Sequence, residues 1–353
     1  MTKPQAVPNL PPADTIISEK HVLLLIFMSP SFRKTSLNKC KVILSSLNIF
    51  ILLISLFHLL PSSFYQDVFI ANAISASKKI SSSHDGSNAT KVVILTFDDN
   101  WKSQFTNARP ILDKYGLRAT FFVICNYVGR DNTTRMNWQD VLTLQKEGHD
   151  IESHTMNHKN LNKLSAAKLD YEVGQSKNCL STHGIKNVTI MATPYNEGWK
   201  NATVTKTISK YYNMARSGNA DIMFLHCDKW VSSQKDCRTF FSNGTMTFAN
   251  RYSIRAWSHN YYDGLYKHNG TQILDKFIQV VNKQTNYNLP AGTINAIPVI
   301  EYHNVDNVNS PYTTRTDLFN SEMKYLHDNG FRVITMSDLG FNQTNNSLYI
   351  KGK

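Results

Sequence analysis

Residues 92–99 read VVILTFDD, and this stretch decides the fold of the 353-residue chain. A nearly continuous apolar run that ends in two acidic residues is typical of a strand buried on both faces, as in a parallel α/β sheet or barrel. Such folds carry their chemistry at the carboxyl ends of the strands. Where the strand gives way to a loop, the side chains of Asp98 and Asp99 can both turn toward one mouth.

The segments that follow alternate between helical and extended patterns. They are a helix at about 101–115, a strand at 117–124, a helix at 138–147 and a short strand at 149–152. Gly116 and Gly148 end the two helices. This rhythm predicts parallel βα units.

Two histidines lie just beyond the third strand, in the segment ESHTMNH at 152–158. The spacing of His154 and His158 lets two imidazoles converge on one ion, and a carboxylate from elsewhere can complete the set. A metal in such a site activates water for hydrolysis. The acidic pair lies one βαβ unit earlier, which makes it a source of that carboxylate.

Three segments in this order resemble the motifs of the polysaccharide deacetylase family, carbohydrate esterase family four. They are TFDD at 96–99, KYGLRATFFV at 114–123 and EGHDIESHTMNH at 147–158, and the resemblance continues into a helix that carries Glu172. It implies an α/β fold, a distorted (β/α) barrel of about seven parallel strands.

The resemblance also implies roles for individual residues. Asp98 corresponds to the catalytic base, and Asp99, His154 and His158 correspond to the ligands of a divalent metal. Zn²⁺ suits an Asp-His-His set, and Co²⁺ or Ni²⁺ could also be loaded.

Two later segments resemble further motifs of the family. ATPY at 192–195 places Tyr195 where a backbone N–H helps to bind the oxyanion, and IPVIEYH at 297–303 ends in His303, which corresponds to the general acid. Ile297, Val299, Glu301 and His303 would share one face of that strand.

The sequence departs from the family pattern at two positions. The arginine that commonly orients the catalytic Asp is Ala192 here, and the glycine that commonly follows the acidic pair is Asn100. Arg255 could supply the missing charge. We count Arg255 and the nearby Trp257 as substrate-binding candidates, because aromatic faces stack on sugar rings.

A helix-plus-strand pattern at 310–339 resembles a unit that precedes the acidic strand in many relatives. Here it comes last in the catalytic region. A circular permutation would explain the order, because the termini of a closed barrel are neighbours.

The sequence of the N-terminal residues 1–90 indicates that the protein is exported. Residues 42–60 form a 19-residue uncharged apolar segment preceded by basic residues, which is close to the length of a membrane helix with its N-terminus inside. Cleavage near residues 71–73 would instead release the protein. We therefore expect a disordered lead at 1–41, a transmembrane anchor or signal segment at 42–60, a Ser-rich linker at 61–90, a catalytic domain at 91–340 and a tail at 341–353.

Glycosylation signals and cysteines agree with export without proving it. Eight Asn-x-Ser/Thr sequons all follow the apolar segment. Cys227 and Cys237 are close enough in sequence to bridge a loop, although free thiols are an equal alternative. The net charge of +12 comes without the lysine or arginine run of a nucleic-acid arm, so we expect no nucleic-acid partner.

Three functions remain open from the sequence. The first is a metal-dependent deacetylase of an extracellular N-acetylglucosamine-type polymer, at the cell membrane with its catalytic domain outside, or secreted. The second is a catalytically silent barrel that binds surface glycan, which the changes at Ala192 and Asn100 motivate. The third is a related metal-dependent amidohydrolase.

Overall fold

The computed structural model describes residues 90–225, 251–259, 270–289, 292–308, 310–344 and 347–352. They belong to a compact unit that spans Gly86–Lys353. The lead, the apolar segment at 42–60, all but the last residue of the linker and the Cys227–Cys237 pair lie outside the described residues. None of the helices in the described ranges is both long enough and apolar enough to cross a membrane.

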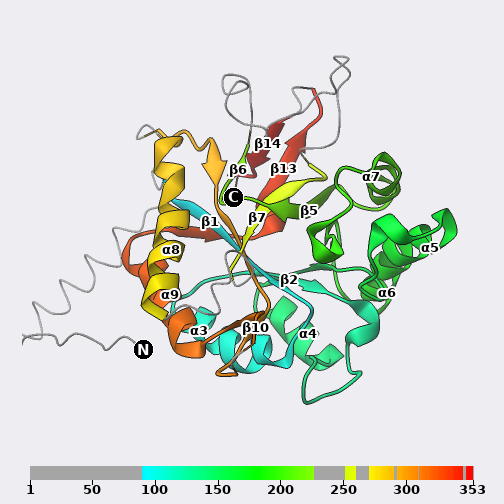
Figure 1. Cartoon of the computed structure of the whole chain (residues 1–353), viewed down its shortest axis with the longest axis horizontal. Helices are drawn as coiled ribbons and strands as arrows, with labels where there is room; N and C mark the ends of the chain where they lie inside the picture. Colours follow the sequence, from blue (N-terminus) through cyan, green and yellow to red (C-terminus); the bar gives the residue numbers. More distant parts are fainter. Residues whose placement is uncertain are drawn as a thin grey trace, which may run out of the picture. The chain divides into compact units, whose positions relative to one another are not determined.

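Seven parallel strands of the described chain close into a barrel (Figure 1), as the sequence predicts. They are, in barrel order, β1 (Val92–Asp98), β2 (Thr120–Val123), β3 (Asp150–Ser153), β4 (Ile190–Ala192), β5 (Met214–Asn219), β7 (Ile254–Ser258) and β9 (Val299–Tyr302). The barrel closes where β9 pairs with β1, with Leu95 beside Ile300 and Phe97 beside Tyr302.

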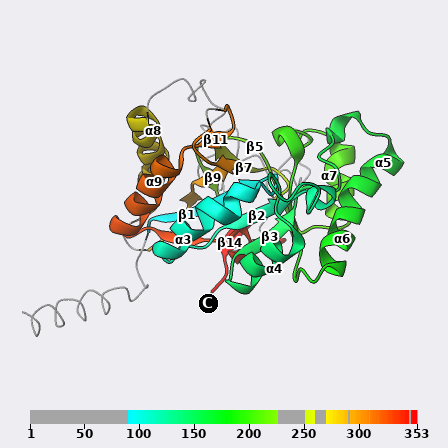
Figure 2. The ribbon, with the colours of Figure 1, turned by 90° about the horizontal axis from the view of Figure 1, so that it is seen from below.

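Helices surround the strands on the outside. They are α3 (Arg109–Lys114), α4 (Trp138–Lys146), α5 (Ala166–Asp170), α6 (Ser176–Thr182), α7 (Ala202–Ser209), α8 (Gly270–Asn282) and α9 (Thr316–Asp328). Both views show α8 and α9 side by side on one flank and α5, α6 and α7 together on the opposite flank (Figures 1 and 2).

Alternation along each strand divides the core into two layers. All seven residues of β1 are buried. Leu95 and Phe97 pack outward in the larger hydrophobic cluster that includes helix side chains, whereas Ile94 packs in a second cluster with strand residues such as Val299. Asp98 lies four residues after Ile94 on the same strand. Because side chains of a strand alternate between its faces, the Asp98 side chain lies on the same inner face as Ile94, at the carboxyl end of the barrel.

The C-terminal segment returns to the opening strand. After α9, β12 (Arg332–Ile334) pairs in parallel with the first half of β1. The helix-plus-strand unit therefore lies beside β1, where a permuted order would place it; the permutation itself stays a prediction.

Short strand pairs complete the described part of the fold. They are β6 (Met223–Phe224) with β8 (Ala296–Ile297), β10 (Asn304–Val305) with β11 (Thr313–Thr314), and β13 (Leu339–Asn342) with β14 (Ser347–Ile350). The predicted tail at 341–353 is thus partly ordered as a strand, because Leu348 of β14 is buried in the inner cluster.

Candidate active site

The acidic pair turns into the mouth of the barrel through two left-handed residues. Asp99 has φ 75° and Asn100 has φ 45°, directly after the end of β1. Asparagine adopts this conformation more readily than most residues, so Asn100 can replace the glycine of the family pattern. Its side-chain oxygen also accepts the backbone N–H of Ile124 at 3.1 Å, which fixes the turn to the end of β2.

His154 follows β3 directly and is oriented by the neighbouring strand. Its side chain is buried, and Nδ1 lies 2.9 Å from the carbonyl oxygen of Ala192. A carbonyl can only accept, so Nδ1 carries the proton and Nε2 presents its lone pair. Nε2 lies 3.5 Å from Oδ1 of Asp99.

His158 completes a three-ligand cluster. Its Nε2 lies 3.4 Å from the same Asp99 oxygen. One ligand atom from each of Asp99, His154 and His158 lies within 4.8 Å of the other two. The Asp99 oxygen is buried and takes no hydrogen bond from the described residues. A cation would satisfy this buried oxygen, so the set that the sequence predicts fits a divalent metal.

The ionisation states suit metal binding. Burial lowers the pKa of both His154 and His158, which keeps the imidazoles neutral and able to ligate. Burial opposes ionisation of Asp99, but the electrostatic interactions of its carboxylate with the surrounding histidines and with Arg135 outweigh burial and lower the pKa of this carboxyl.

Asp98 is paired with Arg216 rather than with Arg255. Nη2 of Arg216, a fully buried residue of β5, pairs with Oδ2 of Asp98, and Nη1 pairs with Glu301. Arg216 is the register partner of Ala192 on the adjacent strand β4. The guanidinium therefore comes from the strand next to the one on which the family motif commonly carries its arginine.

The structure places Arg255 and Trp257 on the outer face of β7. Arg255 alternates with the inner residues Ile254 and Ala256 of β7, and its guanidinium lies 4.0 Å from the ring centre of Trp199. Trp257 is 1% exposed and packs in the outer hydrophobic cluster. Both side chains therefore lie on the opposite face of β7 from Ile254 and Ala256, and the structure does not bring them together with Asp98; their substrate-binding roles stay a prediction.

Burial and the neighbouring charges together set the pKa of Asp98. Burial raises it to about 7 and the Glu301 carboxylate adds to the increase, whereas Arg216 opposes it. In Glu301, burial is outweighed by Arg216 and His303, and the pKa is lowered. Asn196 braces the group: it accepts from Arg216 at 2.8 Å and donates to Glu301 at 3.1 Å. Oδ1 of Asp98 stays buried without a hydrogen bond from the described residues.

His303 lies beside this pair. It follows β9, and one atom each of Asp98, Glu301 and His303 lies within 4.8 Å of the others. The amide of Gln104 donates to the carbonyl oxygens of both Asp98 and His303, which ties the ends of β1 and β9 together. Arg216 carries one positive charge and pairs with both carboxylates of this group, so a cation bound here would compete with its guanidinium for their oxygens.

Tyr195 stands at the rim on the metal side. It has φ 62° within the turn Pro194–Asn196, and 61% of its surface is exposed. Its hydroxyl donates to the carbonyl oxygen of His158 at 3.3 Å, and its ring centre lies 4.7 Å from the His158 ring. The structure thus brings together Asp98, Asp99, His154, His158, Tyr195 and His303, all six of the predicted catalytic and metal residues.

Several supporting residues were not assigned a role from the sequence. Glu172, noted only for its place in a helix, accepts from both the backbone and the side chain of Asn157 at 2.8 Å and so anchors the loop before His158. A disulfide joins Cys125 and Cys179. The backbone N–H of Cys125 donates to Thr155 in the same histidine loop, at 3.1 Å. The 54-residue separation of the two cysteines gave no signal for this pairing.

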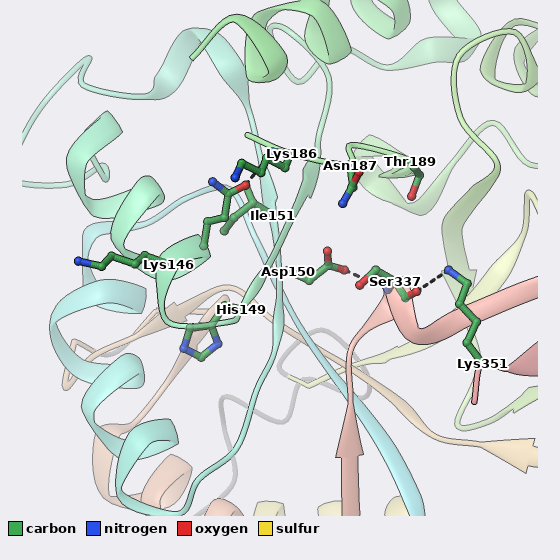
Figure 3. Close-up of a pocket in the computed structure, with 10 residues that line it drawn as sticks. Lys146, His149, Asp150, Ile151, Lys186, Asn187, Thr189, Ser337 and Lys351 are labelled. Carbon is green, nitrogen blue, oxygen red and sulfur yellow. Dashed lines mark hydrogen bonds between the residues drawn. The ribbon is translucent and has the colours of Figure 1, made fainter. Parts of the chain in front are cut away.

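A separate cavity of about 690 Å³ opens at the other end of β3 (Figure 3). Asp150, at the start of the strand, accepts hydrogen bonds from Thr120 and from the backbone of Ser337, both at 3.1 Å. The side chains of Lys186 and Lys351 line the same space. Because His154 follows the opposite end of β3, this cavity is not part of the metal cluster.

Part of the chain is similar in sequence to known proteins. Residues 85–215 match the family model described as polysaccharide deacetylase. The Bacillus subtilis protein YxkH, named for the same family, is 32% identical over 116 residues, which is 32% of this chain and 41% of YxkH.

Two other relatives carry substrate names. A peptidoglycan-N-acetylglucosamine deacetylase of Bacillus cereus is 35% identical over 26% of this chain and 40% of its own. A poly-beta-1,6-N-acetyl-D-glucosamine N-deacetylase of Staphylococcus aureus is 30% identical over 29% of this chain and 40% of its own.

Among solved structures, a family 4 carbohydrate esterase from Streptomyces lividans is 16% identical and has a TM-score of 0.46, over 75% of this chain and 100% of that one. The matched segment spans less than half of the three sequence relatives described above. The match covers residues 85–215, and this part of the chain is similar to the polysaccharide deacetylase family, carbohydrate esterase family four.

Proposed function

We propose that this protein is a metal-dependent N-deacetylase that hydrolyses the acetamido groups of an extracellular N-acetylglucosamine-type polymer. One observation carries the proposal: the ligand atoms of Asp99, His154 and His158 converge beside the buried Asp98–Arg216 pair. The relatives named as deacetylases of peptidoglycan and of poly-β-1,6-N-acetylglucosamine support the same substrate class.

Asp99, His154 and His158 would hold the metal, and Zn²⁺ suits their one-oxygen, two-nitrogen set. A divalent ion bound there would polarise the acetyl carbonyl and favour deprotonation of the attacking water. The chain itself prepares this site by holding both imidazoles neutral and by fixing the His154 ring against the Ala192 carbonyl.

Asp98 acts as the base in this proposal. As the water oxygen bonds to the carbonyl carbon, one water proton passes to the Asp98 carboxylate, whose Oδ1 is not engaged by described residues. A pKa raised by burial to about 7 makes this carboxylate a stronger base than an exposed one. Arg216 holds the other oxygen and fixes the direction of the carboxylate.

The remaining groups serve the breakdown of the tetrahedral species. The backbone N–H of Tyr195 is the oxyanion donor that the family resemblance implies. His303, beside Glu301 at 3.9 Å, gives a proton to the amine nitrogen as the C–N bond breaks, so the products are acetate and a free amino sugar.

Acetate release tests the proposal. The metal-loaded protein should release acetate from at least one of a panel of chitin-type, poly-β-1,6-linked and peptidoglycan oligomers. Asp98→Asn and His303→Ala should each lower the rate at least about 100-fold. A loaded, folded protein that releases acetate from none of them would overturn the assignment.

The alternative of a silent glycan-binding barrel loses its motivation. It depended on the missing arginine at Ala192 and on Asn100. Arg216 supplies the guanidinium from the neighbouring strand, and Asn100 holds the left-handed turn.

The proposed location of the catalytic domain is outside the cell membrane. The apolar segment at 42–60 would direct its export, either as a retained anchor or as a signal segment that is removed. The Cys125–Cys179 disulfide supports an oxidising compartment, since such bonds are rare in the cytosol. Three sequon asparagines of the described chain, Asn132, Asn187 and Asn342, are exposed and so accessible to modification.

A further inference from the structure

An exposed aromatic ring lies against His303 at the site. Tyr312 is 45% exposed, and its ring centre lies 5.3 Å from that of His303. A second exposed ring, that of Tyr195, is 61% exposed and lies beside His158, one of the proposed metal ligands. Of the six large hydrophobic side chains exposed in the described ranges, these two contact a ring of the site.

The backbone holds Tyr312 in place. Its carbonyl oxygen accepts the N–H of Asn304, the residue after His303, at 3.0 Å. The next residues form β11, which pairs with β10 in a register that sets Thr313 beside Asn304. Thr314 is buried and its hydroxyl lies 3.1 Å from the buried His259 ring. A ring carried on this support presents its face with little loss of conformational freedom on binding.

The chemistry of the leaving group decides what this ring would meet. His303 must reach the amide nitrogen, which stays attached to the sugar while the acetyl group turns toward Asp99, His154 and His158. The reacting sugar therefore covers His303. The exposed Tyr312 ring lies against His303 and makes no ring contact with a proposed metal ligand among the described residues, so we expect the next sugar of a chain to be the group that covers it. Stacking of a sugar on a tyrosine ring is favourable because it removes the apolar face of the sugar and the face of the aromatic ring from water.

We propose that Tyr312 is a stacking platform for the sugar that neighbours the reacting residue, so that the enzyme prefers chains over single sugars. This inference rests on the proposed deacetylase function and deepens it. Tyr312 acts on substrate length and not on the chemical step.

The test is a length series. Acetate release is measured on N-acetylglucosamine and on its oligomers up to the hexamer, in β-1,4 and β-1,6 linkage, for the full chain and for Tyr312→Ala, Tyr312→Phe and Tyr349→Ala. Tyr349 is the matched control, a tyrosine of β14 with a similar exposure of 47%. Tyr312→Ala should raise KM for oligomers roughly three- to tenfold, with kcat and the single-sugar rate unchanged. Tyr312→Phe and Tyr349→Ala should behave as the parent protein.

The other outcomes are distinguishable. An active parent whose Tyr312→Ala variant keeps its oligomer KM overturns the inference and leaves the function intact. Equal losses on the single sugar and the hexamer, with a shifted pH–rate profile, mean that Tyr312 only positions His303, and this also overturns it. If the parent releases no acetate, the deacetylase proposal fails, and hexamer affinity by calorimetry then decides: an unchanged Kd in Tyr312→Ala overturns the platform, and a three- to tenfold weaker Kd supports it.

Discussion

The guanidinium of Arg216 compensates for the small side chain at Ala192. The two residues are register partners on β5 and β4, so an arginine on either strand projects from the same level of the barrel wall. Arg216 is fully buried and pairs with Asp98 and Glu301 at once. The presence of a positive charge near Asp98 should therefore matter more for activity than which of the two strands carries it.

Removal of this charge should damage both catalysis and folding. Arg216→Ala leaves two buried carboxylates without their partner, which costs about 3–5 kcal/mol of unfolding free energy, and kcat/KM should fall roughly 100-fold. The double variant Ala192→Arg/Arg216→Ala should recover part of both. Arg255→Ala, which faces away from the site, is the matched control. Equal activity of Arg216→Ala and Arg255→Ala would contradict this role, and urea unfolding monitors the stability of each variant.

At the scale of elements, the loop between β3 and α5 carries both histidines and depends on Glu172. The Glu172 carboxylate accepts two hydrogen bonds from Asn157, next to His158. Glu172→Ala should weaken metal affinity about tenfold by loosening this loop, because partners outside the ligand set orient metal ligands. Glu197→Ala is the control, since Glu197 holds Asn160 and Asn162 beyond the histidines. Calorimetric titration with Zn²⁺ checks both, and equal affinities in the two variants would refute the anchor.

At the other end of β3, the buried carboxyl of Asp150 should make the stability of the protein depend on pH. Burial raises the pKa of Asp150 to about 6 from 3.8, against the hydrogen bonds from Ser337 and Thr120. The folded state therefore binds this proton more tightly than the unfolded chain. The resulting stabilisation is full below about pH 4 and is lost as the pH rises through about 6.

Asp150→Asn removes this titration. Its unfolding free energy relative to the parent protein should therefore increase between pH 4 and pH 7, as measured by urea unfolding across that range. Asp338→Asn is a nearby comparison whose carboxylate caps the turn at 336–338. A stability difference for Asp150→Asn that does not change with pH would show that the carboxyl titrates normally.

For the whole molecule, the Cys125–Cys179 bond links the segment after β2 to α6 across 54 residues. A crosslink that closes a loop of this length lowers the conformational entropy of the unfolded chain. The loop-closure entropy corresponds to about 4 kcal/mol of unfolding free energy. The Cys125→Ser/Cys179→Ser variant should lose a large part of that and unfold at a lower temperature. Thermal unfolding with and without reductant checks the claim: the parent protein should respond to reductant, and the variant should not.

The sequence predicted the parts of the molecule that depend on local pattern. The segment VVILTFDD predicted a strand buried on both faces. The histidine pair after the third strand predicted metal ligands near the end of that strand. Arg216 could not be found in this way, because its partnership with Asp98 depends on which strands are neighbours in the closed barrel and on their register. For a related reason the sequence did not show that Arg255 lies on the outer face of β7, because barrel closure sets which face of that strand is the inner one.

Direct metal binding tests the central claim, that Asp99, His154 and His158 hold a cation beside the base Asp98. The metal content of the purified full chain and its titration with Zn²⁺ are compared with those of Asp99→Ala, His154→Ala and Asp98→Asn. We predict one bound ion in the parent protein and in Asp98→Asn, which should lose turnover, and loss of the ion in the other two variants. Unchanged metal affinity in Asp99→Ala and His154→Ala would contradict the account.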